Sequence, residues 1–276
     1  MGWMARRASG LSPRTRLLAV VLSVAVVAVG LGAAVLMPAN AGATARPAAT
    51  PTASRSAAIS TAAKAFGGVP FVGALFATAG GIDAHSCTAS VVQSAHGDLA
   101  VTAAHCLDGV QGQVSFAPGY ANGKEPYGVW QVTAIYTDQA WQSNQDPDDD
   151  VAFIRIADSD DKPIQSVTGA DRLGTASAKS SLVRVIGYPD GTDQPVSCVN
   201  WATHFSATQL QFDCDNYTDG TSGGPFIVDA SGAAGAGTVV GVIGGYEQGG
   251  DTPEVSYASA FGATVTALYR QAEAAG

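Results

Sequence analysis

The chain has 276 residues, of which 46% are hydrophobic and 13% are charged, and its formal net charge is −9. This apolar content is enough for a substantial core, and the length suits one all-β enzyme domain with additional segments. The acidic balance excludes nucleic acid as a partner, because binding to phosphates requires a basic face.

The N-terminal segment has the layout of a secretory signal. Four arginines come before an uncharged apolar run at residues 17–37: Arg6, Arg7, Arg14 and Arg16. Ala39 and Ala41 then form an A-x-A cleavage site. We predict a signal peptide over residues 1–41 and a secreted, extracellular protein. The alternative is an uncleaved anchor that leaves the enzyme facing outside, since about 20 apolar residues span a bilayer. The paired arginines leave Sec and twin-arginine export both open.

Residues 42–64 are rich in Ala, Thr, Pro and Ser and cannot bury enough apolar surface to fold alone. They are interpreted as a linker or a pro-segment, and whether they inhibit the enzyme stays open. The folded domain is expected over residues 65–276.

Short runs rich in β-branched and aromatic residues follow, separated by turn residues, which predicts strands. The runs are residues 69–76, 88–93, 99–102, 114–116, 129–136, 151–156, 182–187, 209–213, 225–228 and 239–243. No long helical pattern lies between them, so the expected class is an all-β sandwich or a pair of barrels. Residues 260–274 carry apolar side chains at helical spacing and predict a C-terminal helix.

The four cysteines are Cys87, Cys106, Cys198 and Cys214. An even number in an exported chain favours disulfides, and three pairings are open. No C-x-x-C spacing occurs, so no metal site is expected at these cysteines.

Ser222 is the candidate nucleophile. It lies in Asp219-Gly220-Thr221-Ser222-Gly223-Gly224-Pro225, where glycines allow a loop to turn its N–H groups towards an oxyanion. Gly220 and Ser222 are the candidate donors. The alternative is an ordinary glycine-rich hairpin turn.

A serine needs a base, and the base needs an acid to orient it. His105 directly follows an apolar run and is the candidate base. His85 and His96 are expected to face solvent, and His204 has no supporting motif. Asp150 opens an apolar strand and is the candidate acid. The acidic residues just before it are expected to form a solvated loop, with a calcium site as the alternative.

These motifs resemble those of the chymotrypsin-like (trypsin-like, S1-type) serine peptidases over residues 66–276. The matching segments are Thr102-Ala103-Ala104-His105-Cys106, Asp150-Val151-Ala152 and Gly220-Thr221-Ser222-Gly223-Gly224-Pro225. The order His, Asp, Ser is also that of the family, whereas other triad folds use other orders. The resemblance implies two six-stranded antiparallel β-barrels with the triad in the cleft between them. It also implies Cys87–Cys106 and Cys198–Cys214 disulfides, and an oxyanion hole made by the N–H groups of Gly220 and Ser222.

Thr221 departs from the pattern, because the animal digestive members have an aspartate there that pairs with a newly freed N-terminus. The chain is therefore more similar to the bacterial glutamyl-endopeptidase-like branch. Ile243 occupies the position where that branch has a histidine near the pocket, so a preference for glutamate is not predicted. The candidate pocket residues are Asn216, Gly244, Gly245, Tyr246 and Glu254. The Glu254 side chain could point into the pocket or face solvent, and both alternatives are open.

We expect a monomeric secreted endopeptidase that acts on proteins or peptides, without a cofactor or a metal. One alternative is a catalytically silent relative that acts as a binding module. Another is a membrane-tethered quality-control peptidase, in which case the membrane is contacted only through the uncleaved N-terminal segment.

Overall fold

The computed structural model describes residues 58–276 except residues 79–83, 111, 178 and 232–234. The chain divides into two units, Met1–Ala53 and Ser54–Gly276, and every described residue belongs to the second. The predicted signal peptide and residues 42–57 of the predicted linker lie outside the described residues. Within the described part of the chain, no helix is both long and apolar enough to cross a membrane.

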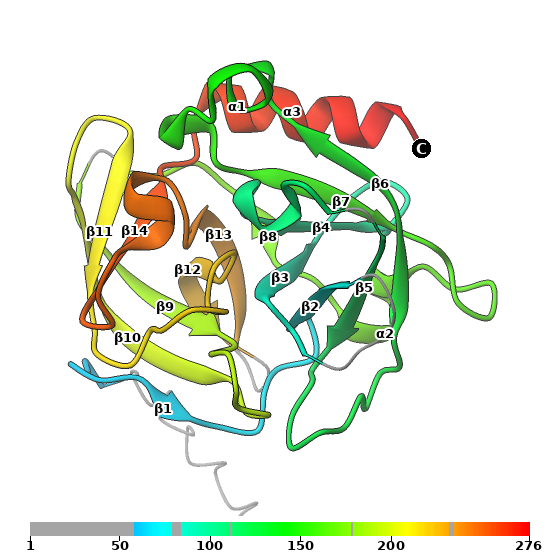
Figure 1. The fold of residues 1–276 in the computed structure, drawn as a ribbon, viewed down its shortest axis with the longest axis horizontal. Coiled ribbons are helices and arrows are strands. Elements are labelled where there is room, and N and C mark those ends of the chain that lie inside the picture. Colours follow the sequence, from blue (N-terminus) through cyan, green and yellow to red (C-terminus); the bar gives the residue numbers. More distant parts are fainter. Residues whose placement is uncertain (1–57, 79–83, 111, 178, 232–234) are drawn as a thin grey trace, which may run out of the picture. The chain divides into compact units, whose positions relative to one another are not determined.

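The first half of the described unit is a closed antiparallel barrel (Figure 1). Its strands pair in the order β2-β3-β4-β7-β6-β5. They are β2 (Val72–Thr78), β3 (Cys87–Val92), β4 (Leu99–Thr102), β5 (Gln113–Pro118), β6 (Trp130–Thr137) and β7 (Ala152–Ile156). Every residue of β3 and β4 is buried, because these strands are covered on both faces. The predicted first six-stranded barrel is therefore present.

The second half forms an open sheet rather than the predicted closed six-stranded barrel. Its strands are β1 (Lys64–Ala65), β8 (Arg172–Leu173), β9 (Ser181–Gly187), β10 (Val196–His204), β11 (Gln209–Asp213), β12 (Pro225–Ser231), β13 (Ala236–Val242) and β14 (Val255–Ser259). The path runs β14-β11-β10-β9-β12-β13-β8, and β1 pairs with β10. Among the described residues β13 and β14 form no ladder, and one isolated bridge, from Ile243 to Ala258, lies just past the end of β13. β13 ends at Val242, and the chain enters the 3-10 turn η3 (Tyr246–Gly249) after Gly245, which has a φ of 79°.

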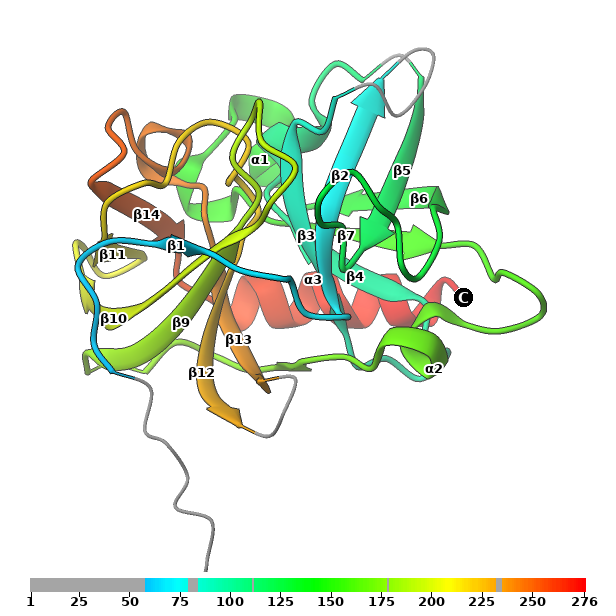
Figure 2. The same ribbon diagram turned by 90° about the horizontal axis from the view of Figure 1, so that it is seen from below.

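Strand β1 shows that the domain begins before residue 65. Lys64 pairs with Ser197 of β10, and the Ser60 N–H donates to the Val199 carbonyl at 2.8 Å. Ala63 is buried in the core of the second sheet. The last residues of the predicted linker are thus part of the fold (Figure 2).

The C-terminal helix α3 (Ala263–Ala274) packs on the first barrel, although it follows the second sheet in sequence (Figure 2). Val265, Leu268 and Ala272 form its buried face, and the Tyr269 ring lies 5.5 Å from the Phe153 ring. The helix begins later than predicted because Gly262 is still extended. The remaining helices, α1 (Gln139–Asn144) and α2 (Ile164–Thr168), and the 3-10 turns η1 (His105–Leu107) and η2 (Pro147–Asp149) are short.

Asp171 is a fully buried carboxyl between the two halves. The Ser90 hydroxyl of β3 donates to its Oδ2 at 3.1 Å, and the Gly237 N–H of β13 donates to its Oδ1 at 2.8 Å. Burial raises the pKa of Asp171 to about 6, although these hydrogen bonds and the charges of Arg184 and Arg172 oppose the rise. The folded protein therefore binds this proton more tightly than the unfolded chain does.

We expect Asp171→Asn to remove a pH-dependent loss of stability. In the native protein the contribution of Asp171 is favourable below about pH 4 and is lost as the pH rises through about 6. A pKa difference of this size corresponds to roughly 3 kcal/mol. Asparagine keeps both contacts without titrating, because its oxygen accepts from Gly237 and its amide donates to Ser90. We expect the free energy of unfolding of Asp171→Asn, measured with urea between pH 4 and 7.5, to increase relative to that of the native protein as the pH rises. A difference that does not change with pH would rule this out.

Candidate active site

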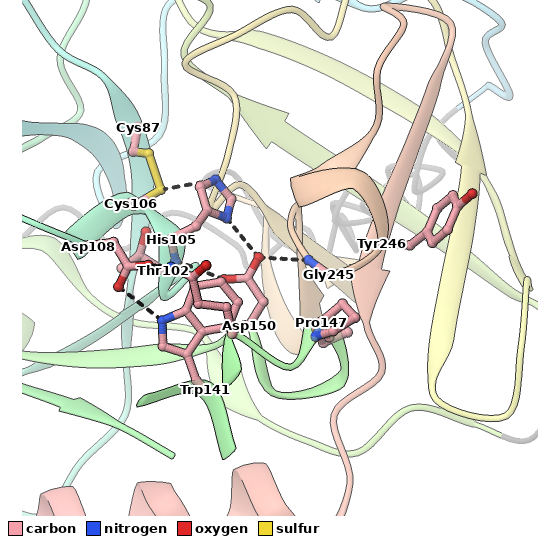
Figure 3. Close-up of polar contacts among 12 residues, drawn as sticks. Cys87, Thr102, His105, Cys106, Asp108, Trp141, Pro147, Asp150, Gly245 and Tyr246 are labelled. Atoms are coloured by element: carbon pink, nitrogen blue, oxygen red, sulfur yellow. Dashed lines mark hydrogen bonds and ion pairs between the residues drawn. A yellow bond between two sulfur atoms is a disulfide. The ribbon is translucent and has the colours of Figure 1, made fainter. Parts of the chain in front are cut away.

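His105 and Asp150 are brought together by the pairing of β4 with β7. Thr102, at the end of β4, lies opposite Ala152, at the start of β7. His105 follows β4 and Asp150 precedes β7, so both side chains lie at the same edge of the barrel. The His105 Nδ1 lies 2.7 Å from the Asp150 Oδ2 (Figure 3).

The Asp150 carboxylate is completely buried and accepts from three N–H groups. The His105 backbone N–H donates to Oδ1 at 2.9 Å, and the Gly245 N–H donates to Oδ2 at 2.8 Å. Gly244 leaves room for this arrangement, because a Cβ there would lie 2.8 Å from Oδ2. A carboxylate only accepts, so the His105 Nδ1 carries the proton and Nε2 is left as the basic atom.

The structure pairs Cys87 with Cys106 and Cys198 with Cys214, as the family resemblance implies. The Cys106 sulfur lies 3.9 Å from the His105 Nε2, so the first disulfide lies directly beside the imidazole (Figure 3). In the described part of the chain, these three residues are the one group whose donor atoms cluster as in a metal site. Both sulfurs are bonded to each other, so they offer no thiolates to a metal.

Ser222 shares a cavity of about 610 Å³ with His105. Within the described residues, no hydrogen bond joins the Ser222 hydroxyl to His105 in this conformation. The flanking glycines Gly220 and Gly223 have φ values of 87° and 80°, which side chains disfavour. Neither the Gly220 N–H nor the Ser222 N–H donates a hydrogen bond to a described residue. Both donors are thus available for an oxyanion next to Ser222.

Thr221 is almost fully buried, and its hydroxyl donates to the Thr218 carbonyl at 2.7 Å. Its side chain also packs on Gly187, where an added Cβ would lie 2.7 Å from the Thr221 Cβ. The residue that replaces the family's aspartate therefore contributes to its own loop through a local hydrogen bond and packing.

The predicted pocket residues do not line the cavity that contains Ser222. Asn216 is exposed, and its side-chain amide donates to the Ala63 carbonyl at 3.2 Å. Glu254 is exposed as well. Gly244 and Gly245 lie against Asp150, while Tyr246 stacks on Phe205 with ring centroids 4.9 Å apart.

Other residues line that cavity instead, and apart from Ile243 and the serine loop the sequence did not place them near the pocket. Tyr217, next to Asn216, points inward and donates from its hydroxyl to the Val185 carbonyl at 2.8 Å. Ile243 lines it as well. Four acidic residues are also part of the lining: Asp190, Asp219, Glu247 and Asp251. A larger cavity of about 790 Å³ lies beside Asp148, His204 and the start of α3, and it contains neither Ser222 nor His105.

The prediction that His85 faces solvent is wrong. His85 is 7% exposed, and its Nε2 lies 2.9 Å from the Thr192 carbonyl. The rings of Phe76, Tyr120 and Tyr188 lie 5.9–6.0 Å from it. His85 is buried because its neighbours Ala84 and Ser86 are exposed while its ring packs among aromatic rings from the two halves of the domain.

The closed barrel, the second sheet and this site define a chymotrypsin-like serine peptidase. The family model for the trypsin-like peptidase domain matches residues 87–242, and the chain belongs to this family. A comparison with curated protein sequences finds no match.

Solved structures of serine proteases are similar to this chain. The protease Anisep from Arthrobacter nicotinovorans is 26% identical with a TM-score of 0.67, and the match covers 77% of this chain and 99% of Anisep. The thermostable serine protease AL20 from an extremophilic microorganism is 26% identical with a TM-score of 0.64, over 75% and 98% of the two chains. A Glu endopeptidase in complex with MPD has a TM-score of 0.60, and the match covers 74% of this chain and 90% of that protein. Its sequence identity is 17%, so this similarity concerns the fold alone.

Proposed function

We propose that this serine-type peptidase is a secreted endopeptidase that forms an acyl-enzyme on Ser222. The observation that carries the proposal is the buried Asp150 carboxylate, which holds the Nδ1 proton of His105 in a cavity shared with Ser222. His105 Nε2 is then free to accept the Ser222 proton as Oγ attacks the peptide carbonyl.

In this reaction Oγ bonds to the carbonyl carbon, and the carbonyl oxygen becomes an oxyanion. The N–H groups of Gly220 and Ser222 donate to it. The imidazolium of His105 next gives its proton to the leaving amine as the C–N bond breaks. Water, deprotonated by His105, attacks the ester, and the C–Oγ bond then breaks as His105 returns this proton to Oγ, which releases the acid product and regenerates Ser222.

The oxyanion hole is proposed to form without a freed N-terminus. Thr221 carries no charge for such a trigger, and its hydroxyl already bonds to Thr218 within the loop. Secretion is supported by the two disulfides, because they form in oxidising compartments. N-terminal sequencing of protein from the culture medium tests this part, and a start near Gly42 or later would agree with it.

Fluorophosphonate labelling of the secreted protein tests the nucleophile. Ser222 should be the labelled residue, as read from tryptic peptides, and prior peptide substrate should slow the labelling. If the purified protein hydrolyses no peptide and takes no label on Ser222, the proposal fails. Labelling before and after removal of residues 42–57 separates this outcome from blockage by the N-terminal segment.

The charge of the cavity predicts which side chains are disfavoured near the cut. Its four carboxylates face no Lys or Arg among the described lining residues. Peptides with Lys or Arg close to the cut should be cleaved faster than the same peptides with Asp or Glu, and added salt should narrow the difference. Glu247→Gln and Asp251→Asn should each reduce this preference by up to about fivefold, the size expected of exposed charges. Asp158→Asn, remote from the cavity, serves as the control. A preference for acidic residues in a cleavage-site library would contradict the prediction.

A further inference from the structure

Thr88, the residue after Cys87 at the start of β3, is fully buried and contacts the serine loop from the other half of the domain. Its N–H donates to the Ser222 carbonyl at 2.7 Å. Its hydroxyl donates to the Gly220 carbonyl at 3.2 Å and accepts from the Tyr188 N–H at 2.9 Å. One residue of the first barrel thus holds the carbonyls of both proposed oxyanion donors.

Further backbone hydrogen bonds hold the loop beside the two free donor N–H groups. Asp219 accepts from the Asp190 N–H at 2.7 Å, and the Thr221 carbonyl accepts from the Gly224 N–H at 2.9 Å. The Gly223 N–H donates to the Ile243 carbonyl at 2.7 Å. The first two bonds each hold the carbonyl of a peptide plane that carries a donor N–H, but they do not set the angle between the two planes.

The peptide between Gly220 and Thr221 connects those two planes. Its N–H donates to the Thr218 carbonyl at 3.2 Å, and its carbonyl is held by the Thr88 hydroxyl. If this peptide rotates, Gly220 turns with it, because a glycine at a φ of 87° has little steric resistance. The Thr88 hydroxyl and the Thr218 carbonyl therefore hold this linking peptide from its two sides, and the angle between the two donors depends on both contacts.

We infer that Thr88 is a positioning residue for the oxyanion hole. Its hydroxyl accepts a hydrogen bond from the Tyr188 N–H and donates one to the Gly220 carbonyl. An apolar side chain of the same shape can do neither. This inference rests on the proposed function, because it takes Gly220 and Ser222 as the donors. The backbone bond from Thr88 to Ser222 is independent of the side chain, so substitutions isolate the hydroxyl.

Three variants test the inference. Thr88→Val keeps the shape and removes the hydroxyl, whereas Thr88→Ser keeps the hydroxyl and removes the methyl. Ser90→Ala is the matched control, since Ser90 is a buried hydroxyl on the same strand that bonds to Asp171 and not to the serine loop. All three are compared by thermal unfolding, by kcat and KM, and by inhibition with a peptide aldehyde and the matching peptide alcohol. The aldehyde forms a tetrahedral adduct with an oxyanion, and the alcohol does not.

Thr88→Val should lower kcat by about 10- to 100-fold, somewhat less than the loss of a whole donor. KM and alcohol binding should stay within about twofold, and aldehyde binding should weaken in parallel with kcat. Thr88→Ser should recover most of kcat, and Ser90→Ala should lose thermal stability without losing kcat.

Two results would overturn the inference. One is a folded Thr88→Val enzyme with unchanged kcat, and the other is equal weakening of aldehyde and alcohol. If Thr88→Val does not fold, Thr88→Ala gives the same comparison with a smaller side chain. If neither variant folds while Thr88→Ser is normal, the hydroxyl is a folding contact and the inference is rejected. Absence of turnover in the native enzyme would instead contradict the proposed function.

Discussion

Ser222→Ala is expected to lower kcat by about a millionfold while leaving KM within a few-fold. Removal of the hydroxyl leaves no atom within reach of the carbonyl that His105 can activate, and the nucleophile and base of a serine peptidase act as a unit. His105→Ala should therefore cost about as much as Ser222→Ala, and the double variant should be hardly worse than either. Single-turnover assays with a peptide ester measure all three.

Ser206→Ala is a suitable control for Ser222→Ala, because Ser206 is an exposed serine in the turn between β10 and β11. It should retain full activity. Unfolding curves should show Ser222→Ala to be as stable as the native protein, since the Ser222 hydroxyl makes no hydrogen bond to a described residue. Activity within tenfold of the native enzyme in Ser222→Ala would move the nucleophile to another residue.

β3 and β4 could be predicted from the sequence because their buried runs are continuous, whereas β6 was predicted from its β-branched and aromatic residues although exposed positions alternate with buried or half-buried ones along it. The predicted run 99–102 coincides with β4, and residues 88–93 differ from β3 by one residue at each end. The C-terminal helix was predicted because its buried face repeats at helical spacing. Such local patterns reflect burial directly.

Strand β10 was missed because its side chains do not form an apolar run. Val196–His204 mixes buried Cys198 and Ala202 with exposed polar residues, and only pairing with β9 and β11 makes it a strand. β1 was missed for the same reason, since two exposed residues become a strand only against β10. The closed second barrel was implied by the family resemblance and not by the strand pattern, and in the structure the path from β14 to β8 stays open.

The sequence identified His105, Asp150 and Ser222 as candidates because their motifs are local, and the structure brings His105 into contact with Asp150. The pocket could not be predicted in the same way. Asn216 has a φ of 74° and its side chain turns to Ala63, while its neighbour Tyr217 lines the cavity from a buried position with its hydroxyl bonded to the Val185 carbonyl. The contact of Thr88 with Gly220 spans 132 residues, and no local pattern in the sequence indicates it.

Asp150→Asn is expected to lower kcat by about ten-thousandfold, the second-largest effect after loss of the nucleophile or base. The native carboxylate accepts from two backbone N–H groups and from the His105 Nδ1. A carboxamide has only one oxygen, so its NH₂ must face at least one of these donors. If the NH₂ faces Nδ1, the proton of His105 moves to Nε2, and this atom can no longer accept from Ser222.

The other amide orientation is not free of cost either, because the NH₂ then faces the His105 backbone N–H in a fully buried position. Asp150→Asn should therefore also lose thermal stability, which separates it from Ser222→Ala. Asp149→Asn changes the adjacent, partly exposed acid and should keep activity within about twofold, since no hydrogen bond joins Asp149 to His105 in the described structure. An active Asp150→Asn enzyme would mean that the orientation of His105 is set by the Cys87–Cys106 disulfide and the backbone rather than by the carboxylate. The equal stability of Asp150→Asn and native protein would mean that the buried amide finds partners other than these three donors.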